Sequence, residues 1–124
     1  MSIVRFNEDH EWVRLDGDEA VVGITDYAQT QLGEVVHVDL PPVGKRIEKG
    51  MEVAAIESVK VSNAINAPIS GEVTGINAAL MADPAKINTD PMGEGWFFKL
   101  RVTDTKQFDA LLDEAAYKKF VDAL

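Results

Sequence analysis

Apolar and polar residues alternate over several short stretches of the chain, with the period of two that half-buried β-strands have. The alternation is clearest over residues 96–102, where one face would carry Trp96, Phe98, Leu100 and Val102. A second alternating stretch, Val36, Val38 and Leu40, ends at the Pro41-Pro42 pair, which cannot continue a strand ladder. We therefore expect a strand in each stretch, and we expect Trp96, Phe98 and Leu100 to be buried together.

Turn and capping residues place further elements along the first part of the chain. Residues 11–15 and 19–23 flank Asp16-Gly17 and form a predicted hairpin. Thr25 can cap a short helix that ends at Gln31 or Leu32, because Gly33 follows as a stop.

The C-terminal segment has the pattern of an amphipathic helix. Its apolar residues recur at i, i+3, i+4 and i+7: Tyr117, Phe120, Val121 and Leu124. Asp113 is placed to cap the first turn. Shorter helical turns are expected over residues 84–87 and 106–111. Together these patterns predict an all-β protein with minor helices and a C-terminal helix.

Length and charge restrict the class of protein. The 124 residues are enough for one domain with a modest core, so residues 1–124 are predicted to be a single domain. The net charge of −9 would repel phosphates and disfavours nucleic-acid binding. No apolar run approaches the roughly 20 residues that span a bilayer, and the N-terminus lacks a signal- or transit-peptide pattern. We expect no membrane partner, and a cytoplasmic protein in preference to a processed mitochondrial-matrix form.

Few side chains could perform chemistry. The chain has no cysteine, which excludes a protein-borne thiol nucleophile and thiolate metal ligands. His10 and His37 come without a metal-spaced set of ligands, and Ser58 has no His and Asp near it in sequence. We expect no metal site, no catalytic residues and no enzymatic activity of the chain's own.

Lys60 lies in a short polar segment between two strand-like segments. Residues 51–56 precede it and residues 65–73 follow it, so it would stand at the tip of a hairpin. A lysine there is solvated and within reach of a modifying enzyme, but most loop lysines only add soluble charge. The local pattern leaves both interpretations open.

Strings of residues along nearly the whole chain have the order and spacing of a known family. They are His10-Glu11-Trp12, Val22-Gly23-Ile24-Thr25-Asp26-Tyr27-Ala28-Gln29, Leu32-Gly33-Glu34-Val35-Val36, Val38-Asp39-Leu40-Pro41, Glu57-Ser58-Val59-Lys60, Ala67-Pro68-Ile69-Ser70-Gly71-Glu72-Val73, Asn88, Pro91 and Gly93-Glu94-Gly95-Trp96. Each string is weak alone, whereas the set is specific. With these strings the chain resembles the H proteins of the glycine cleavage system, a lipoyl-carrier family.

The resemblance implies a fold and a set of site residues. The fold would be a lipoyl/biotinyl-type sandwich, a flattened barrel of two half-sheets, with an N-terminal hairpin extension and the C-terminal helix. Lipoate would be joined to Lys60, and the neighbours Val59 and Val61 favour lipoate over biotin, whose carriers usually frame the lysine with methionines. Glu57 and Ser58 would be recognised by the lipoate-attaching enzyme. Glu11 would hold the amine-loaded arm through charge-assisted hydrogen bonds.

The resemblance also implies a function. The chain would shuttle an aminomethyl group and reducing equivalents between glycine decarboxylase, aminomethyltransferase and dihydrolipoamide dehydrogenase. Three residues depart from the family pattern: Asn63 and Ala64 stand where relatives usually have Ser-Asp, and Met92 stands where they have Tyr. These departures keep one alternative open, an H-like carrier that relays lipoate to other lipoyl-dependent complexes. A second alternative, of a different class, is an unmodified binding module on the same scaffold.

Overall fold

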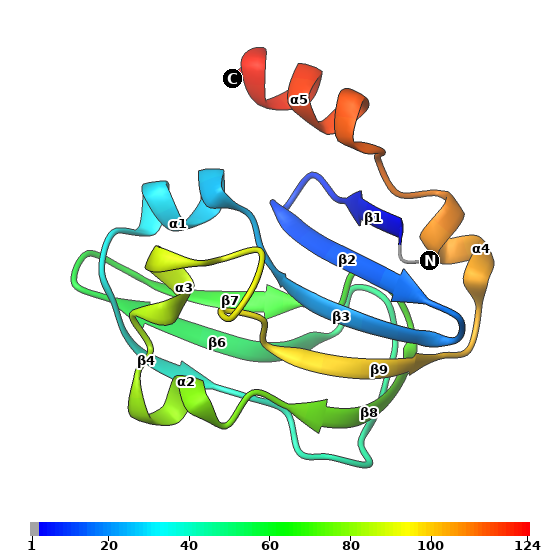
Figure 1. The fold of residues 1–124 in the computed structure, drawn as a ribbon, viewed down its shortest axis with the longest axis horizontal. Coiled ribbons are helices and arrows are strands. Elements are labelled where there is room, and N and C mark those ends of the chain that lie inside the picture. The colour runs from blue at the N-terminus through cyan, green and yellow to red at the C-terminus, as the bar shows by residue number, and fades with distance from the viewer. Residues whose placement is uncertain (1–2) are drawn as a thin grey trace.

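The computed structural model describes residues 3–124, whose strands form two antiparallel sheets (Figure 1). The larger sheet has the strand order β1 (Ile3–Phe6), β2 (Glu11–Asp16), β3 (Glu19–Ile24), β9 (Phe98–Val102), β8 (Gly71–Ile76) and β5 (Arg46–Ile47). The smaller sheet has the order β4 (Val35–Asp39), β6 (Glu52–Ser58) and β7 (Ser62–Asn66). Within residues 3–124 no strand belongs to both sheets, so the predicted sandwich is confirmed as an open one and is not closed into a barrel.

The helices found in the described residues are short and lie around the sandwich. They are α1 (Asp26–Leu32), α2 (Ala79–Ala82), α3 (Lys86–Thr89), α4 (Thr105–Asp109) and α5 (Glu114–Asp122). In Figure 1, α1, α2 and α3 gather at the end of the molecule where the β6–β7 turn lies, while α5 lies apart, above β1.

Both predicted helix caps are present. The Thr25 hydroxyl accepts a hydrogen bond from the Ala28 backbone N–H at the start of α1, and Gly33 ends that helix with a φ of 78°. The Asp113 carboxylate accepts from the Ala116 backbone N–H at the start of α5. A side-chain acceptor satisfies an N–H that has no partner inside the helix, and glycine takes a positive φ without a Cβ penalty.

The core lies between the two sheets. The larger sheet contributes Val13, Val22 and Leu100, and the smaller sheet contributes Val38, Ile56 and Ile65, all of them buried in one cluster.

The predicted hairpin of β2 and β3 is confirmed, and its register pairs Asp16 with Glu19 across the turn.

The expectation for residues 96–102 was correct only from Phe98 onward. Phe98 and Leu100 are fully buried, but β9 begins at Phe98 and the alternation does not reach back to Trp96. Phe97 is fully buried in the main core, whereas Trp96 is half-buried and packs in a separate cluster. The loop before the strand changes the side-chain directions, so Trp96 does not share the buried face.

The expectation for residues 36–40 was wrong at its first position. The register between β4 and β6 shifts between Val35 and His37, which leaves Val36 as an extra residue. Such a bulge moves the following side chains to the other face. Val35 and Val38 are therefore the buried residues of β4, and the Val36 side chain is exposed.

A second apolar cluster holds α5 against the larger sheet. Its buried members are Phe6, Trp12 and Tyr117, and the rings of Phe6 and Tyr117 stack with centroids 4.6 Å apart. The Trp12 indole N–H donates to the Pro91 carbonyl oxygen across 2.9 Å. A Cβ atom on Gly23 would lie 2.7 Å from the Trp12 indole ring, so this position requires glycine.

Candidate functional site

Lys60 lies in the three-residue link between β6 and β7, at the tip of a hairpin as the sequence predicts. Its side chain is exposed. The turn is closed by the Ser58 backbone N–H, which donates to the Val61 carbonyl oxygen across 2.8 Å. The lysine therefore stands on an ordered turn.

Ser58 organises that turn. Its side chain is buried, and the hydroxyl oxygen accepts hydrogen bonds from the backbone N–H groups of Lys60 at 3.2 Å and Val61 at 3.1 Å. This local bonding gives Ser58 a structural role in addition to the recognition role predicted from the resemblance. Glu57 is exposed on β6, where it pairs with His37 and Ser62, and its carboxylate is open to a partner protein.

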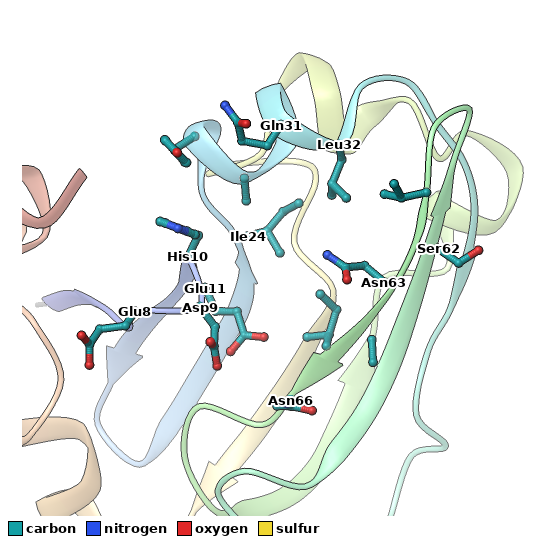
Figure 2. A pocket seen from close by; sticks show the side chains of 15 residues that line it. Glu8, Asp9, His10, Glu11, Ile24, Gln31, Leu32, Ser62, Asn63 and Asn66 are labelled. Carbon is teal, nitrogen blue, oxygen red and sulfur yellow. The ribbon is translucent and has the colours of Figure 1, made fainter. Parts of the chain in front are cut away.

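A cleft of about 670 Å³ opens beside the hairpin, between the edge of the smaller sheet, α1 and the start of β2 (Figure 2). It is lined by Glu8, Asp9, His10, Glu11, Ile24, Tyr27, Ala28, Gln31, Leu32, Val61, Ser62, Asn63, Ala64, Ile65 and Asn66. Apolar side chains of α1 and carboxylates at the start of β2 meet in the same cleft. Such a lining suits a flexible apolar chain with a cationic end.

Glu11 is the buried acid of this cleft, with a side chain only 2% exposed. The Asn7 side-chain amide donates to a Glu11 carboxyl oxygen across 2.8 Å. The pKa of Glu11 is raised to about 7. Burial is the largest cause and the nearby Asp9 charge adds to it, while hydrogen bonds from Asn7 and the Asn66 backbone oppose the shift. A carboxyl group poised near neutral pH becomes charged when a cation approaches.

The other acids of the cleft are Glu8 and Asp9, which are exposed at its mouth. Ala64 stands where relatives usually have an acid, and this replacement alone would leave Glu11 as the main acid of the cleft. Ala64 and Asn63 do line the wall formed by β7. Acids from the opposite wall nevertheless give the cleft three carboxyl groups. Met92 lies outside this cleft and packs with Trp12 in the second apolar cluster, the one that holds α5 against the larger sheet.

His10 has the only positive φ of a non-glycine residue within residues 3–124, at 66°. Its ring stacks on Tyr27 with centroids 4.5 Å apart, and its Nδ1 atom is hydrogen-bonded to the Tyr117 hydroxyl across 2.8 Å. That hydroxyl also lies 2.7 Å from the Thr25 hydroxyl oxygen. Burial lowers the pKa of His10, against the opposing charge of Asp9. These contacts assign His10 a structural place in the cleft wall.

Sequence reasoning missed Asn7 and the role of the Tyr117 hydroxyl. Asn7 stands before β2, and its side-chain carbonyl oxygen accepts from the backbone N–H groups of Asp9 at 3.1 Å and Glu11 at 2.9 Å. Asparagine at the start of a turn is a usable signal for such bonds. Tyr117 gave no local signal, because its hydroxyl partners lie about a hundred residues earlier in the chain.

The part of the chain that the structure describes contains no helix long and apolar enough to cross a membrane. In the same part, no group of three or more His, Cys, Asp or Glu side chains could hold a metal ion.

An open two-sheet sandwich with an exposed lysine at a hairpin tip, next to a cleft with carboxylates, defines a carrier domain of the lipoyl type. The family model of the glycine cleavage H-protein matches residues 4–123. The chain belongs to this family, whose members are lipoate-carrying components of the glycine cleavage system.

Individual relatives agree with the family match. The glycine cleavage system H protein of Parvibaculum lavamentivorans is 54% identical over 124 residues, covering 100% of this chain and 99% of the relative. That of Beijerinckia indica is 50% identical over 124 residues and covers 100% of both chains. The crystal structure of the H protein from Mycobacterium marinum superposes with a TM-score of 0.87 at 35% identity, covering 98% of this chain and 97% of that one.

These matches confirm the predicted family, the sandwich fold and the carrier function. The roles of Lys60, Glu57, Ser58 and Glu11 remain predictions, which the geometry above makes specific.

Proposed function

We propose that residues 1–124 act as one carrier domain that bears lipoate as an amide on Lys60. The observation that carries this proposal is the position of Lys60, exposed on an ordered hairpin turn beside a cleft that contains the buried acid Glu11. Lipoate supplies a dithiolane that is opened and reclosed by thiol–disulfide exchange, chemistry that a chain without cysteine cannot supply itself.

In this proposal the chain's own residues position and shelter the cargo. Ser58 keeps the hairpin turn closed, so the attachment point is presented in one conformation. The cleft admits the arm between α1 and β7, and its apolar residues exclude water from a bound chain. Glu11 accepts hydrogen bonds from a cationic aminomethyl group, which keeps that group from being released as formaldehyde.

The proposed partners are glycine decarboxylase, aminomethyltransferase, dihydrolipoamide dehydrogenase and the enzyme that attaches lipoate. The protein would be a covalent carrier rather than an enzyme, because its contribution is tethering: a tethered group reaches a high effective concentration in whichever active site has docked the carrier. The exposed Glu57 next to the turn would contact the attaching enzyme. Since the relatives named above are bacterial, we place this activity in the cytoplasm.

Peptide mapping tests the attachment. The protein is co-expressed with a lipoate ligase in the presence of lipoate, and its peptides are analysed by mass spectrometry. Label is expected on Lys60 and is expected to vanish in Lys60→Arg. Lys49→Arg, a change of another exposed loop lysine, is the control and should retain the label. Label on a different lysine, or an unlabelled protein, contradicts the proposal and favours the unmodified binding module.

A further inference from the structure

The Lys60 side chain lies against the backbone of Gly33, at the C-terminal end of α1. A Cβ atom built on Gly33 would lie 3.2 Å from Lys60 Cε, 3.4 Å from Cδ and 3.7 Å from Nζ. The end of the lysine stem therefore runs across the side of Gly33 on which any other residue would carry its side chain. We propose that Gly33 is the seat of the lysine stem, a positioning residue that directs the lipoyl arm from the hairpin into the cleft.

The seat and the hairpin are fixed to each other. The Val59 backbone N–H, next to Lys60, donates to the Glu34 carbonyl oxygen across 3.0 Å. The segment that contains Gly33 and the hairpin link that carries Lys60 are thus joined by a backbone hydrogen bond. This bond fixes the position of the Lys60 backbone relative to the C-terminal end of α1. The lysine side chain therefore contacts Gly33 rather than another residue near the helix.

Asn88 on α3 also restrains the backbone of Gly33. Its side-chain amide donates to the Gly33 carbonyl oxygen across 2.8 Å and to the Gln29 side-chain oxygen across 3.1 Å. Its side-chain carbonyl oxygen accepts from the Val35 backbone N–H across 2.9 Å. The residues on both sides of Glu34 are therefore tied to one side chain, and a turn held at so many points keeps a single conformation.

The seat adjoins residues that line the cleft. Gly33 follows the last residue of α1, and Leu32 and Ala28 of that helix, four residues apart and so on one face, both line the cleft. Figure 2 shows Leu32 and Gln31 at the upper part of the cleft and Asp9 and Glu11 at its lower part. A stem that rests on Gly33 starts at the α1 end of this cleft, and a chain that continues along Ala28 ends among the carboxylates.

A side chain at position 33 would take the place of the stem. A methyl group there would lie 3.2 Å from Cε, which is closer than most Cβ contacts, so the stem would have to shift away from position 33 by a few tenths of an ångström. The attachment reaction would still find an exposed amine, because the hairpin turn itself is held by Ser58. Glycine at position 33 thus leaves the stem undisturbed, in addition to allowing the positive φ.

The inference rests on the proposed attachment at Lys60, and a pair of glycine variants tests it. Gly33→Ala adds a methyl group under the stem, whereas Gly44→Ala adds one at a φ of 92° with no atom within 4 Å. Both variants force alanine into a positive φ, so the control also carries the strain of a positive φ. The lipoylated forms are loaded with the aminomethyl cargo, and its decay is followed by intact mass. Gly33→Ala should release formaldehyde about fivefold faster or more than Gly44→Ala, as expected when an added methyl group disturbs a close contact.

A second measurement does not depend on the loaded protein. In parent protein carrying isotope-labelled glycine and lysine, nuclear Overhauser effects should connect the Gly33 α-protons with the Lys60 ε-protons, before and after lipoylation. Their absence after lipoylation, or equal decay of the two alanine variants, overturns the seat and leaves attachment at Lys60 intact. Attachment at another lysine overturns both proposals. If Gly33→Ala does not fold, the nuclear Overhauser effects alone decide.

Discussion

Asn7 binds Glu11 twice: its side-chain amide donates to the Glu11 carboxylate across 2.8 Å, and its side-chain carbonyl oxygen accepts from the Glu11 backbone N–H across 2.9 Å. These two bonds hold an ionisable group in a buried position at the start of β2. The pKa of that group, raised to about 7, ties the stability of the protein to pH.

Glu11→Gln should stabilise the unlipoylated protein at neutral and higher pH. The pKa of Glu11 is about 7 in the folded chain and 4.5 as its reference value, so between these values the folded state binds more protons than the unfolded state. The parent's unfolding free energy therefore falls as pH rises through this window, and the loss is complete above pH 7. Glutamine removes this loss, which is on the order of 3 kcal/mol for a shift of this size.

Urea unfolding at about pH 4 and pH 8 measures this effect, with the two proteins compared at each pH. Glu8→Gln, which changes an exposed acid at the mouth of the same cleft, is the control and should keep the parent's pH dependence. Equal pH dependence in Glu11→Gln and the parent would show that the buried carboxyl does not titrate in this window.

The same substitution should weaken the protein as a carrier. Glu11→Gln should accelerate the release of formaldehyde from the aminomethyl-loaded protein, and Ala64→Asp on the opposite wall should slow it. A charge-assisted hydrogen bond is worth roughly 1.5–3 kcal/mol when shielded and less at an exposed site such as Ala64. Decay of the loaded species is followed by mass spectrometry, and Ala79→Asp, on helix α2, which contributes no residue to the cleft lining, supplies the same charge as a control. Parent-like decay in both variants would favour the lipoate-relay alternative.

Phe98→Ala should cost about 3–5 kcal/mol of unfolding free energy, because the ring is fully buried in the core between the sheets. Phe97→Ala should cost a similar amount, since Phe97 is equally buried. Thermal and urea unfolding of both variants are the measurements. An unchanged melting temperature in Phe98→Ala would place the ring outside the core.

Asn88→Ala should destabilise the protein by about 1–3 kcal/mol, because it leaves the Val35 N–H and the Gly33 carbonyl oxygen without their partner. Thr89→Ala, at the exposed next residue of α3, is the control and should change stability by less than about 0.5 kcal/mol. Urea unfolding measures both, and a similar loss in the two variants would mean that the amide bonds of Asn88 contribute nothing specific.

The parts of the fold that the sequence predicted depend on near neighbours. The caps Thr25 and Asp113 bond to N–H groups three residues away, and the β2–β3 hairpin turns at Gly17-Asp18, one position after the predicted Asp16-Gly17, so local patterns were nearly sufficient. The bulge at Val36 depends on the partner strand β6, and the direction of the Trp96 side chain depends on the loop before β9. The alternation of apolar and polar residues does not predict either feature.

The candidate site, too, could be predicted from the sequence only in part. The hairpin position of Lys60 followed from flanking strand patterns. The burial of Glu11 did not, because it requires β7 and Asn7 to enclose the start of β2, and the resemblance pointed only to an acid at that position. The contact between Lys60 and Gly33 joins residues that are distant in sequence, and only the folded chain brings them together.

The Tyr117 hydroxyl joins α5 to His10 and to Thr25, the cap of α1. Two walls of the cleft are thereby bonded to the last helix, although no residue of that helix lines the cleft. A shortened protein that ended before Tyr117 would keep both sheets and every lining residue. It would keep the backbone bond from the Thr25 N–H to the His10 carbonyl oxygen, but it would lose the hydroxyl that bonds both the His10 ring and the Thr25 side chain. In protein engineering, α5 should therefore be treated as part of the binding apparatus and not as a tail to be trimmed.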